Sequence, residues 1–380
     1  MAEAGTLANP FTPTFGQMPA NLAGRDRLLR EMNQALNAQA RAPELTMLLS
    51  GARGSGKTVL LASIADEAER SGWISVSTVA AEGMLEDILV QAIDKAGHLV
   101  DASGGAKSLT GVGIGQILSL EWENGESQPS NWRLRMQKLI SALEEVGSGL
   151  LVLVDELDPS IEEAIHLAST YQLFVMENRK VALVMAGLPH NIERAKSDKR
   201  ISFVRRAQQR KLGRVADIEV GEAIRKTVLD GGRTIGDEAL AIAVDAAAGF
   251  PFMIQLVGYR MWGRNPGGDE VSSEDARVGS ALAQEEFRSY VLESTYRDLS
   301  DGDVSFLKAM LPDEGQSLMR DVAARMGKTS SYASTYRERL LRQGVIGEPD
   351  RNTVGFELPG FREYFTERIG WEGHLVNCPK

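Results

Sequence analysis

Long apolar runs alternate with helical periodicity in the first half of the chain. Segments rich in apolar residues predict buried strands in four places, at residues 45–50, 73–80, 150–154 and 181–187. Apolar positions at helical spacing predict helices between them, at residues 58–70, 84–96, 132–146 and 161–178. Strands and helices that alternate in this way form βαβ units, so we expect an α/β fold with a parallel sheet.

The N-terminal segment has a different pattern. Residues 1–20 hold three prolines with Phe11 and Phe15 among them, which predicts an extended arm that packs through its aromatic side chains. A helix should follow the arm, because apolar positions from Leu28 to Leu36 recur at helical spacing.

The pattern changes again in two later places. Gly and Ser dominate residues 101–130, which we interpret as an insertion in which residues 111–122 could form a small hairpin. Beyond residue 212 the strand-like runs end and helical patterns dominate, the longest over residues 238–262. Ser272 is a good N-cap for the next helix, and the chain after about residue 315 is locally basic and ends in a β-like segment.

Composition narrows the class of protein. With 380 residues, 43% hydrophobic and 25% charged, we expect a globular protein of two or three domains. The single cysteine and four scattered histidines offer neither a disulfide framework nor a metal-ligand spacing. The pattern contains no signal sequence and no apolar run of membrane-span length, so we infer a cytoplasmic protein without a membrane partner. A net charge of −10 argues against indiscriminate coating of nucleic acid.

One motif carries specific chemistry. Residues 51–58 read GARGSGKT and fit the phosphate-binding pattern G-x-x-x-x-G-K-[ST], with a strand before and a helix after. Glycines let backbone N–H groups point at phosphate oxygens, and the helix N-terminus adds partial positive charge. Lys57 can reach the β- and γ-phosphates, and the Thr58 hydroxyl can ligate Mg²⁺. The residues expected to contact nucleotide here are Gly51, Ala52, Arg53, Gly54, Ser55, Gly56, Lys57, Thr58 and Val59.

A second motif supports hydrolysis over binding alone. The apolar run 150–154 delivers Asp155 and Glu156 at the carboxyl end of a strand, where open α/β sheets bind ligands. An Asp there can hold the Mg²⁺ shell, and an adjacent Glu can polarise the attacking water. An apolar strand that ends in acids is common by itself, so this assignment depends on the upstream phosphate loop.

Together these motifs resemble the AAA+/STAND-type ATPases, close to the archaeal and bacterial origin-recognition-like ATPases. The resemblance spans about residues 20–365, and its anchors are ANLAGRD, GARGSGKT, LLVLVDELD, VALVMAG and GFPFMIQ in the family's order. It implies ATP as the nucleotide, with Mg²⁺. It also implies that Leu22, Gly24 and Arg25 lie near the adenine and that Pro251 approaches the nucleotide. An ordinary turn before a helix is the alternative explanation for Gly24 and Arg25.

The resemblance implies four parts. An extended arm (1–20) would precede a P-loop NTPase core (21–212), a helical lid domain (213–295) and a C-terminal winged helix-turn-helix domain (296–370). Two family features are absent: GFPFMIQ holds no lid arginine, and VALVMAG ends without a polar Asn or Thr. These departures favour a slow, nucleotide-dependent switch over a fast ATPase.

Residues 193–214 are strongly basic, with nine Lys and Arg against two acids. Arg205 and Arg206 lie where the family often places an arginine finger, which implies a homo-oligomer in which one subunit completes its neighbour's site. A solvated basic face and a contact to the DNA backbone are the alternatives.

The C-terminal segment resembles a winged helix. Residues 318–326 and 330–343 would form the helix-turn-helix, and residues 344–359 the wing. A recognition helix presents its N-terminal residues to base edges, which suggests duplex DNA as a partner. The residues expected at bases are Ser330, Ser331, Tyr332 and Thr335, and those expected at phosphates are Arg337 and Arg351.

Three hypotheses therefore stand. The first is an ATPase that couples nucleotide state to DNA binding. The second is a signalling or defence switch whose winged helix docks a protein partner, because such modules also bind proteins. The third is a module that binds ATP or ADP and barely hydrolyses.

Overall fold

The computed structural model describes residues 7–14, 17–52, 54–102, 129–350 and 352–370. The hairpin expected at residues 111–122 lies outside this part of the chain. The described residues divide into two compact units, which are treated separately below. We call them the sheet unit (25–51 and 57–212) and the helical unit (1–24, 52–56 and 213–380).

The sheet unit contains five parallel strands in the order β2-β3-β4-β1-β5. The first four are the strands expected from the apolar runs, and they confirm the α/β fold with a parallel sheet. The fifth was not predicted, because its sequence QQRKL is polar and it lies at the edge, where only Leu212 is buried. The strands are β1 (Thr46–Gly51), β2 (Ile74–Val79), β3 (Leu150–Asp155), β4 (Val181–Gly187) and β5 (Gln208–Leu212).

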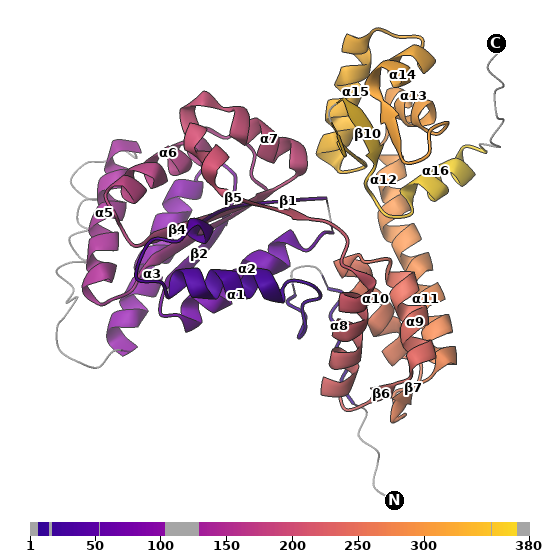
Figure 1. Cartoon of the computed structure of the whole chain (residues 1–380), viewed down its shortest axis with the longest axis horizontal. Coiled ribbons are helices and arrows are strands. Elements are labelled where there is room, and N and C mark those ends of the chain that lie inside the picture. Colours follow the sequence, from indigo (N-terminus) through magenta and orange to yellow (C-terminus); the bar gives the residue numbers. More distant parts are fainter. Residues whose placement is uncertain (1–6, 15–16, 53, 103–128, 351, 371–380) are drawn as a thin grey trace, which may run out of the picture. The chain divides into compact units, whose positions relative to one another are not determined.

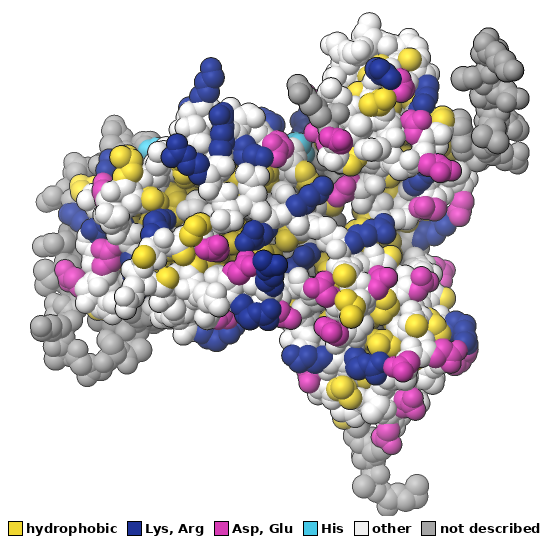
Figure 2. All heavy atoms as spheres, viewed as in Figure 1, with side chains coloured by type: hydrophobic (Ala, Val, Ile, Leu, Met, Phe, Trp, Pro, Cys, Tyr) yellow, Lys and Arg dark blue, Asp and Glu magenta, His cyan; other side chains and the backbone are white. Residues whose placement is uncertain are grey.

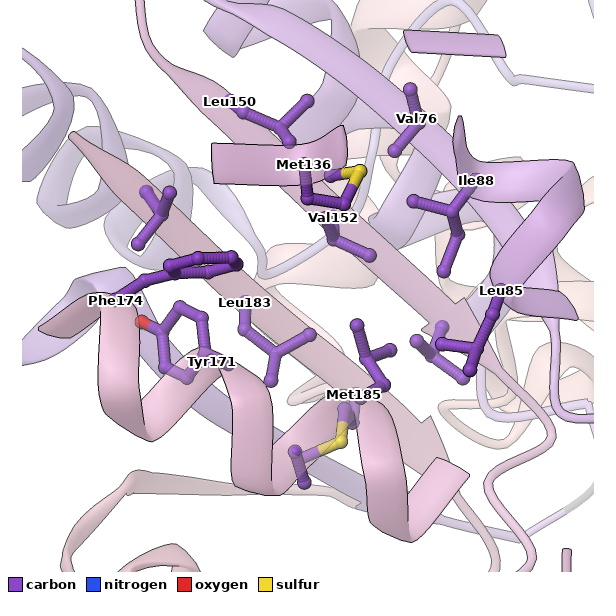
Figure 3. Packing of buried hydrophobic residues seen from close by; sticks show 14 of the residues in the cluster. Val76, Leu85, Ile88, Met136, Leu150, Val152, Tyr171, Phe174, Leu183 and Met185 are labelled. Carbon is purple, nitrogen blue, oxygen red and sulfur yellow. The ribbon is translucent and has the colours of Figure 1, made fainter. Parts of the chain in front are cut away.

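Helices cover both faces of this sheet (Figure 1). Alternate strand residues explain the two layers: Leu151 and Leu153 face α1 and α2, whereas Leu150 and Val152 face α3, α5 and α6. Figure 3 shows the second layer, where Met136, Tyr171 and Phe174 pack on the strands. The helical elements are α1 (Asp26–Leu36), η1 (Pro43–Leu45), α2 (Lys57–Arg70), α3 (Met84–Ala102), α5 (Pro129–Glu145), α6 (Glu162–Met176), α7 (Pro189–Ser197) and η2 (Lys199–Arg206).

The helical unit begins with a bundle of four helices and two short paired strands. The long helix expected over residues 238–262 is two helices, because Ala248 and Gly249 both adopt positive φ (48° and 73°) and Pro251 starts a new helix. Ser272 caps α11 as expected, since its side chain accepts from the Asp275 amide. The elements are α8 (Asp217–Asp230), β6 (Thr234–Ile235), α9 (Asp237–Ala247), α10 (Pro251–Trp262), β7 (Glu270–Val271) and α11 (Ser273–Phe287).

A second core lies further along this unit, and we call it the C-terminal module (residues 300–368). It contains an antiparallel sheet in the order β8-β10-β9 and the helix pair α14 and α15. Thr329 caps α15, because its hydroxyl accepts from the Tyr332 amide. The elements from the bundle onward are η3 (Arg288–Leu292), α12 (Glu293–Arg297), α13 (Asp301–Met310), β8 (Gln316–Leu318), α14 (Met319–Arg325), α15 (Ser330–Gln343), β9 (Ile346–Gly347), β10 (Thr353–Phe356) and α16 (Phe361–Arg368).

The break between α9 and α10 predicts that Gly249 cannot be replaced without backbone strain. A Cβ on Gly249 would lie 2.5 Å from the Val215 carbonyl oxygen, and its φ of 73° is strained for other residues. We expect Gly249→Ala to lower the free energy of unfolding by about 1–3 kcal/mol. Gly267→Ala is the matched control, since a Cβ there meets nothing within 4 Å. Calorimetric melting of both variants makes the comparison, and equal melting temperatures would contradict the strain.

Candidate nucleotide site

The loop between β1 and α2 has the backbone shape that the motif requires. Gly54 and Gly56 adopt positive φ (75° and 83°), which lets the chain curl between the two elements. The Ser55 amide donates to the Ala52 carbonyl at 3.3 Å, and α2 begins at Lys57. Arg53 lies outside the described residues. The first turn of α2 therefore presents its N-terminal amides at the end of this loop.

Two side chains follow directly on the helix. The Lys57 ammonium donates to the Gly51 carbonyl at 2.8 Å, so it lies over the loop that it is expected to serve. The Thr58 hydroxyl donates to Asp155 Oδ2 at 2.5 Å. The contact joins the helix after β1 to the carboxyl end of β3, which lies two strands away in the sheet.

Glu156 follows Asp155 with an unusual backbone. Its φ is 51°, the left-handed region, which costs a non-glycine residue about 1–2 kcal/mol. The amide of Glu156 donates to Asp155 Oδ1 at 2.8 Å, so both Asp155 oxygens have a partner. The Glu156 side chain is exposed at this edge. Such strain is typical of functional sites.

The residues present fit a phosphate with a hard cation. The Ser55 hydroxyl is buried and has no hydrogen-bond partner within the described residues, and it lies on the loop itself. Thr58 and Asp155 offer a hydroxyl and a carboxylate oxygen side by side, the ligand types that Mg²⁺ prefers. Within the described part of the chain, no cluster of three His, Cys, Asp or Glu offers an alternative metal site.

The family-implied contacts occupy defined places. A Cβ on Gly56 would lie 3.5 Å from Pro251, so the start of α10 approaches the loop. Gly24 has a φ of 65°, and a Cβ there would lie 2.6 Å from a Glu219 oxygen. Gly24 is thus packed against α8, in a turn directly before α1. Leu22 precedes it, Arg25 is the N-cap of α1, and Val59 lies in the first turn of α2.

Arg205 and Arg206 are not brought to this loop. They end η2 and precede β5, whose first residue Gln208 pairs with Met47. Met47 lies four residues before Gly51, which is about 13 Å along the strand. Both side chains are exposed, and the Arg205 Nε donates to the Lys196 carbonyl at 2.6 Å. Figure 2 shows the Lys and Arg side chains gathered over α7 and the segment after it.

Several cations of this basic stretch are already paired. Hydrogen bonds from Arg200 lower the pKa of the Asp198 carboxyl to about 2, and Arg200 also binds Glu162 at 2.8 Å. Arg194 lies 3.8 Å from Asp158, a carboxylate that sequence reasoning did not single out. Burial raises the pKa of Asp158, but hydrogen bonds from Ser160 and the charges of Arg194 and His190 outweigh burial and lower it.

The C-terminal candidates share the first turns of α15. Ser330, Ser331, Tyr332 and Thr335 are all exposed, whereas Arg351 lies outside the described residues. Arg337 is only 27% exposed and forms an ion pair with Glu348, so it is not a free cation. A groove of about 430 Å³ lies beside this helix, lined by Leu318, Met319, Arg320, Ser330, Ser334, Arg337 and Asn352.

Comparisons with known proteins agree with this geometry. Residues 21–178 match the family of the AAA ATPase domain, and residues 289–365 match a domain family of unknown function, DUF8462. A search of the curated proteins found no match. None of the helices in the described part of the chain has the length and apolar character needed to cross a membrane.

Two solved structures share the fold. The Walker-type ATPase PABY2304 of Pyrococcus abyssi is 16% identical with a TM-score of 0.62, and the match covers 90% of this chain and 96% of that one. The ORC2 protein of Aeropyrum pernix, solved as ADPNP-ADP complexes, is 13% identical with a TM-score of 0.57, covering 94% and 97%. These likenesses show that the chain shares the P-loop ATPase fold.

Proposed function

We propose that the chain binds ATP with Mg²⁺ and hydrolyses it slowly to ADP and phosphate. The observation that carries this proposal is the contact between Thr58 and Asp155 at the end of a well-formed phosphate loop. The nucleotide-bound ORC2 structure supports the choice of nucleotide, because its fold is shared.

Each residue of the site has one task. The loop amides and Lys57 hold the phosphates, while Thr58 and Asp155 hold Mg²⁺. When bound, the cation would neutralise charge on the β- and γ-phosphates. Glu156 orients the attacking water and accepts its proton. Leu22, Gly24 and Arg25 face the base, and Pro251 approaches the nucleotide from the bundle.

Slow turnover follows from two features of the described residues. Arg260, the arginine of α10, is bound to Glu286 at 2.7 Å and is committed within the bundle. Strand β4 ends in Met-Ala-Gly, so no polar side chain of that strand reaches the γ-phosphate. The charge that develops during phosphoryl transfer has fewer partners than in a fast ATPase.

The loop lysine and the acidic strand end should be separable by mutation. We expect Lys57→Ala to abolish measurable ATP binding, because the phosphates lose their main cation. Glu156→Gln should bind ATP within about threefold of wild type and lose at least tenfold in turnover. Calorimetric affinity and phosphate release are measured separately. Equal losses of affinity in the two variants would disprove these roles.

The basic stretch is proposed to act on a neighbouring subunit. Arg205 and Arg206 lie near the amino ends of β1 and β5, whereas the phosphate loop follows the carboxyl end of β1. This separation favours action on a neighbouring subunit over action in their own site. Arg205 or Arg206 would then neutralise charge at the neighbour's γ-phosphate, and the assembly would require ATP.

Complementation tests this sharing directly. An Arg205→Ala/Arg206→Ala variant lacks the cations, and a Lys57→Ala variant lacks the phosphate site. Each alone should be nearly inactive, whereas a mixture should recover turnover, because a mixed pair contains one complete site. Specific activity should also rise with protein concentration. Full activity of the double-arginine variant by itself would show that the site works alone.

The C-terminal module is proposed to bind duplex DNA. Its helix pair and antiparallel sheet have the element order of a winged helix, and α15 presents hydroxyl groups at its N-terminal turns. Lys328, just before α15, and Arg351, expected in the wing tip, would supply positive charge. Nucleotide state would then bias DNA binding through the bundle.

The ion pair of Arg337 provides a matched test. Arg337→Ala and Arg351→Ala should each weaken DNA binding and reduce the slope of log affinity against log salt by about 0.9. Glu348→Gln should strengthen binding, since it releases Arg337 for phosphate. Fluorescence anisotropy of the full chain with a duplex at several salt concentrations measures all three. Absence of salt-sensitive DNA binding at low ionic strength would instead favour docking of a protein partner.

The second candidate is docking of a protein partner, and charge balance favours it. Residues 300–368 hold ten basic and eleven acidic side chains. Three arginines here bind carboxylates of the chain itself: Arg325 binds Asp313, Arg337 binds Glu348 and Arg339 binds Asp303. Leu318, 40% exposed, lines the groove, which suits an apolar anchor of a partner.

A further inference from the structure

The N-terminal arm is built into the bundle of the helical unit. Phe11 is 2% exposed and belongs to the same buried cluster as α8 to α11. A Cβ on Gly258 would lie 2.2 Å from the Phe11 ring, so α10 has a glycine where the ring lies. Gly231 leaves room in the same way for Pro10, which would lie 2.8 Å from a Cβ there. The bundle is therefore shaped to receive the arm.

Polar contacts hold the arm in one register. The Asn9 side chain donates to the Tyr259 carbonyl at 3.0 Å, and the Thr12 amide donates to Gln255 Oε1 at 3.0 Å. Gln255 is only 9% exposed with the arm in place, so its hydrogen bond to Thr12 lies largely shielded from water. A shielded hydrogen bond of this kind helps to hold the arm on α10.

A second anchor lies just before the segment implied to face adenine. The Asn21 amide group donates to Thr227 Oγ1 at 3.2 Å and to Asp230 Oδ2 at 3.0 Å, both on α8. Gly24 packs against Glu219 of the same helix. Leu22 lies between these two contacts. The base-facing segment is thus tied to α8 at both of its ends.

We propose that Phe11 and Asn21 are positioning residues for nucleotide binding. They fix the segment 21–24 on the bundle before nucleotide arrives, so that segment and bundle act as one element. The inference rests on the proposed nucleotide-binding function. Without the anchors, the entropy cost of ordering the segment falls on the binding step and weakens affinity, although no phosphate contact is lost.

Nucleotide affinity of three full-length variants tests this. Phe11→Ala and Asn21→Ala should each raise the Kd for MgADP at least fivefold, measured by calorimetry. Val271→Ala is the matched control, because Val271 is buried in the same bundle core, 1% exposed, on the short strand β7. It should destabilise the bundle and leave the Kd within twofold. Asn21→Ala opens no core cavity, so it remains informative if Phe11→Ala folds poorly.

The outcomes distinguish failure of the proposed nucleotide binding from failure of the positioning role. A wild-type chain that binds no MgADP overturns the proposed function itself. Wild-type binding with unchanged Kd in Asn21→Ala overturns the positioning role and leaves that function intact. An equal loss of affinity in Val271→Ala also overturns it, because general loosening of the bundle would then explain the effect. Amide hydrogen exchange of residues 253–259 should rise at least fivefold in Phe11→Ala, and unchanged exchange would contradict docking of the arm on α10.

Discussion

The contact between the Thr58 hydroxyl and Asp155 depends on the parallel order of the sheet. All five parallel strands have their carboxyl ends on the same side of the sheet, so the helix after β1 and the acidic residue that ends β3 meet there. Two apolar layers hold this register, because strand residues alternate between α1 and α2 on one face and α3, α5 and α6 on the other. If a strand slipped by one residue against its neighbour, its apolar side chains would all point to the opposite face of the sheet. This penalty fixes the register and so fixes the positions of the residues at the carboxyl ends of the strands.

Much of this arrangement is readable from sequence, because the informative residues are local. The apolar runs of β1, β3 and β4 are buried on both faces and leave no ambiguity, and GARGSGKT specifies its own turn. Strand β5 was not predicted because QQRKL contains no apolar run. An outermost strand is held mainly by backbone hydrogen bonds to its neighbour, here β1, and these leave no signal in the sequence. The break at Ala248 and Gly249 was missed because alanine-rich sequence continues the helical pattern through it, while a close approach of Val215 decides the geometry.

Side-chain pairing was the least predictable feature. The sequence shows nine cations in residues 193–214, but Arg194, Arg200 and Arg210 have carboxylate partners that come from distant segments. Arg337 is paired by the same principle, through Glu348 just after β9. Counting charges along the chain therefore overestimates the cations that can meet a phosphate. Only the three-dimensional fold shows that Arg194, Arg200 and Arg210 are paired with carboxylates, whereas the Arg205 Nε donates to a backbone carbonyl, that of Lys196.

The N-terminal arm is part of the hydrophobic core of the helical unit. Phe11 lies among residues of α8 to α11, more than two hundred positions away, and fills space that Gly231 and Gly258 leave open. The first residues of the chain therefore complete the core of a bundle that is synthesised more than two hundred residues later. A contact of such long sequence separation forms late, because a long loop must close before it is stabilised. The segment tied to α8 through Asn21 and Gly24 gains its order from that late step, so competence to hold the base would follow docking of the arm.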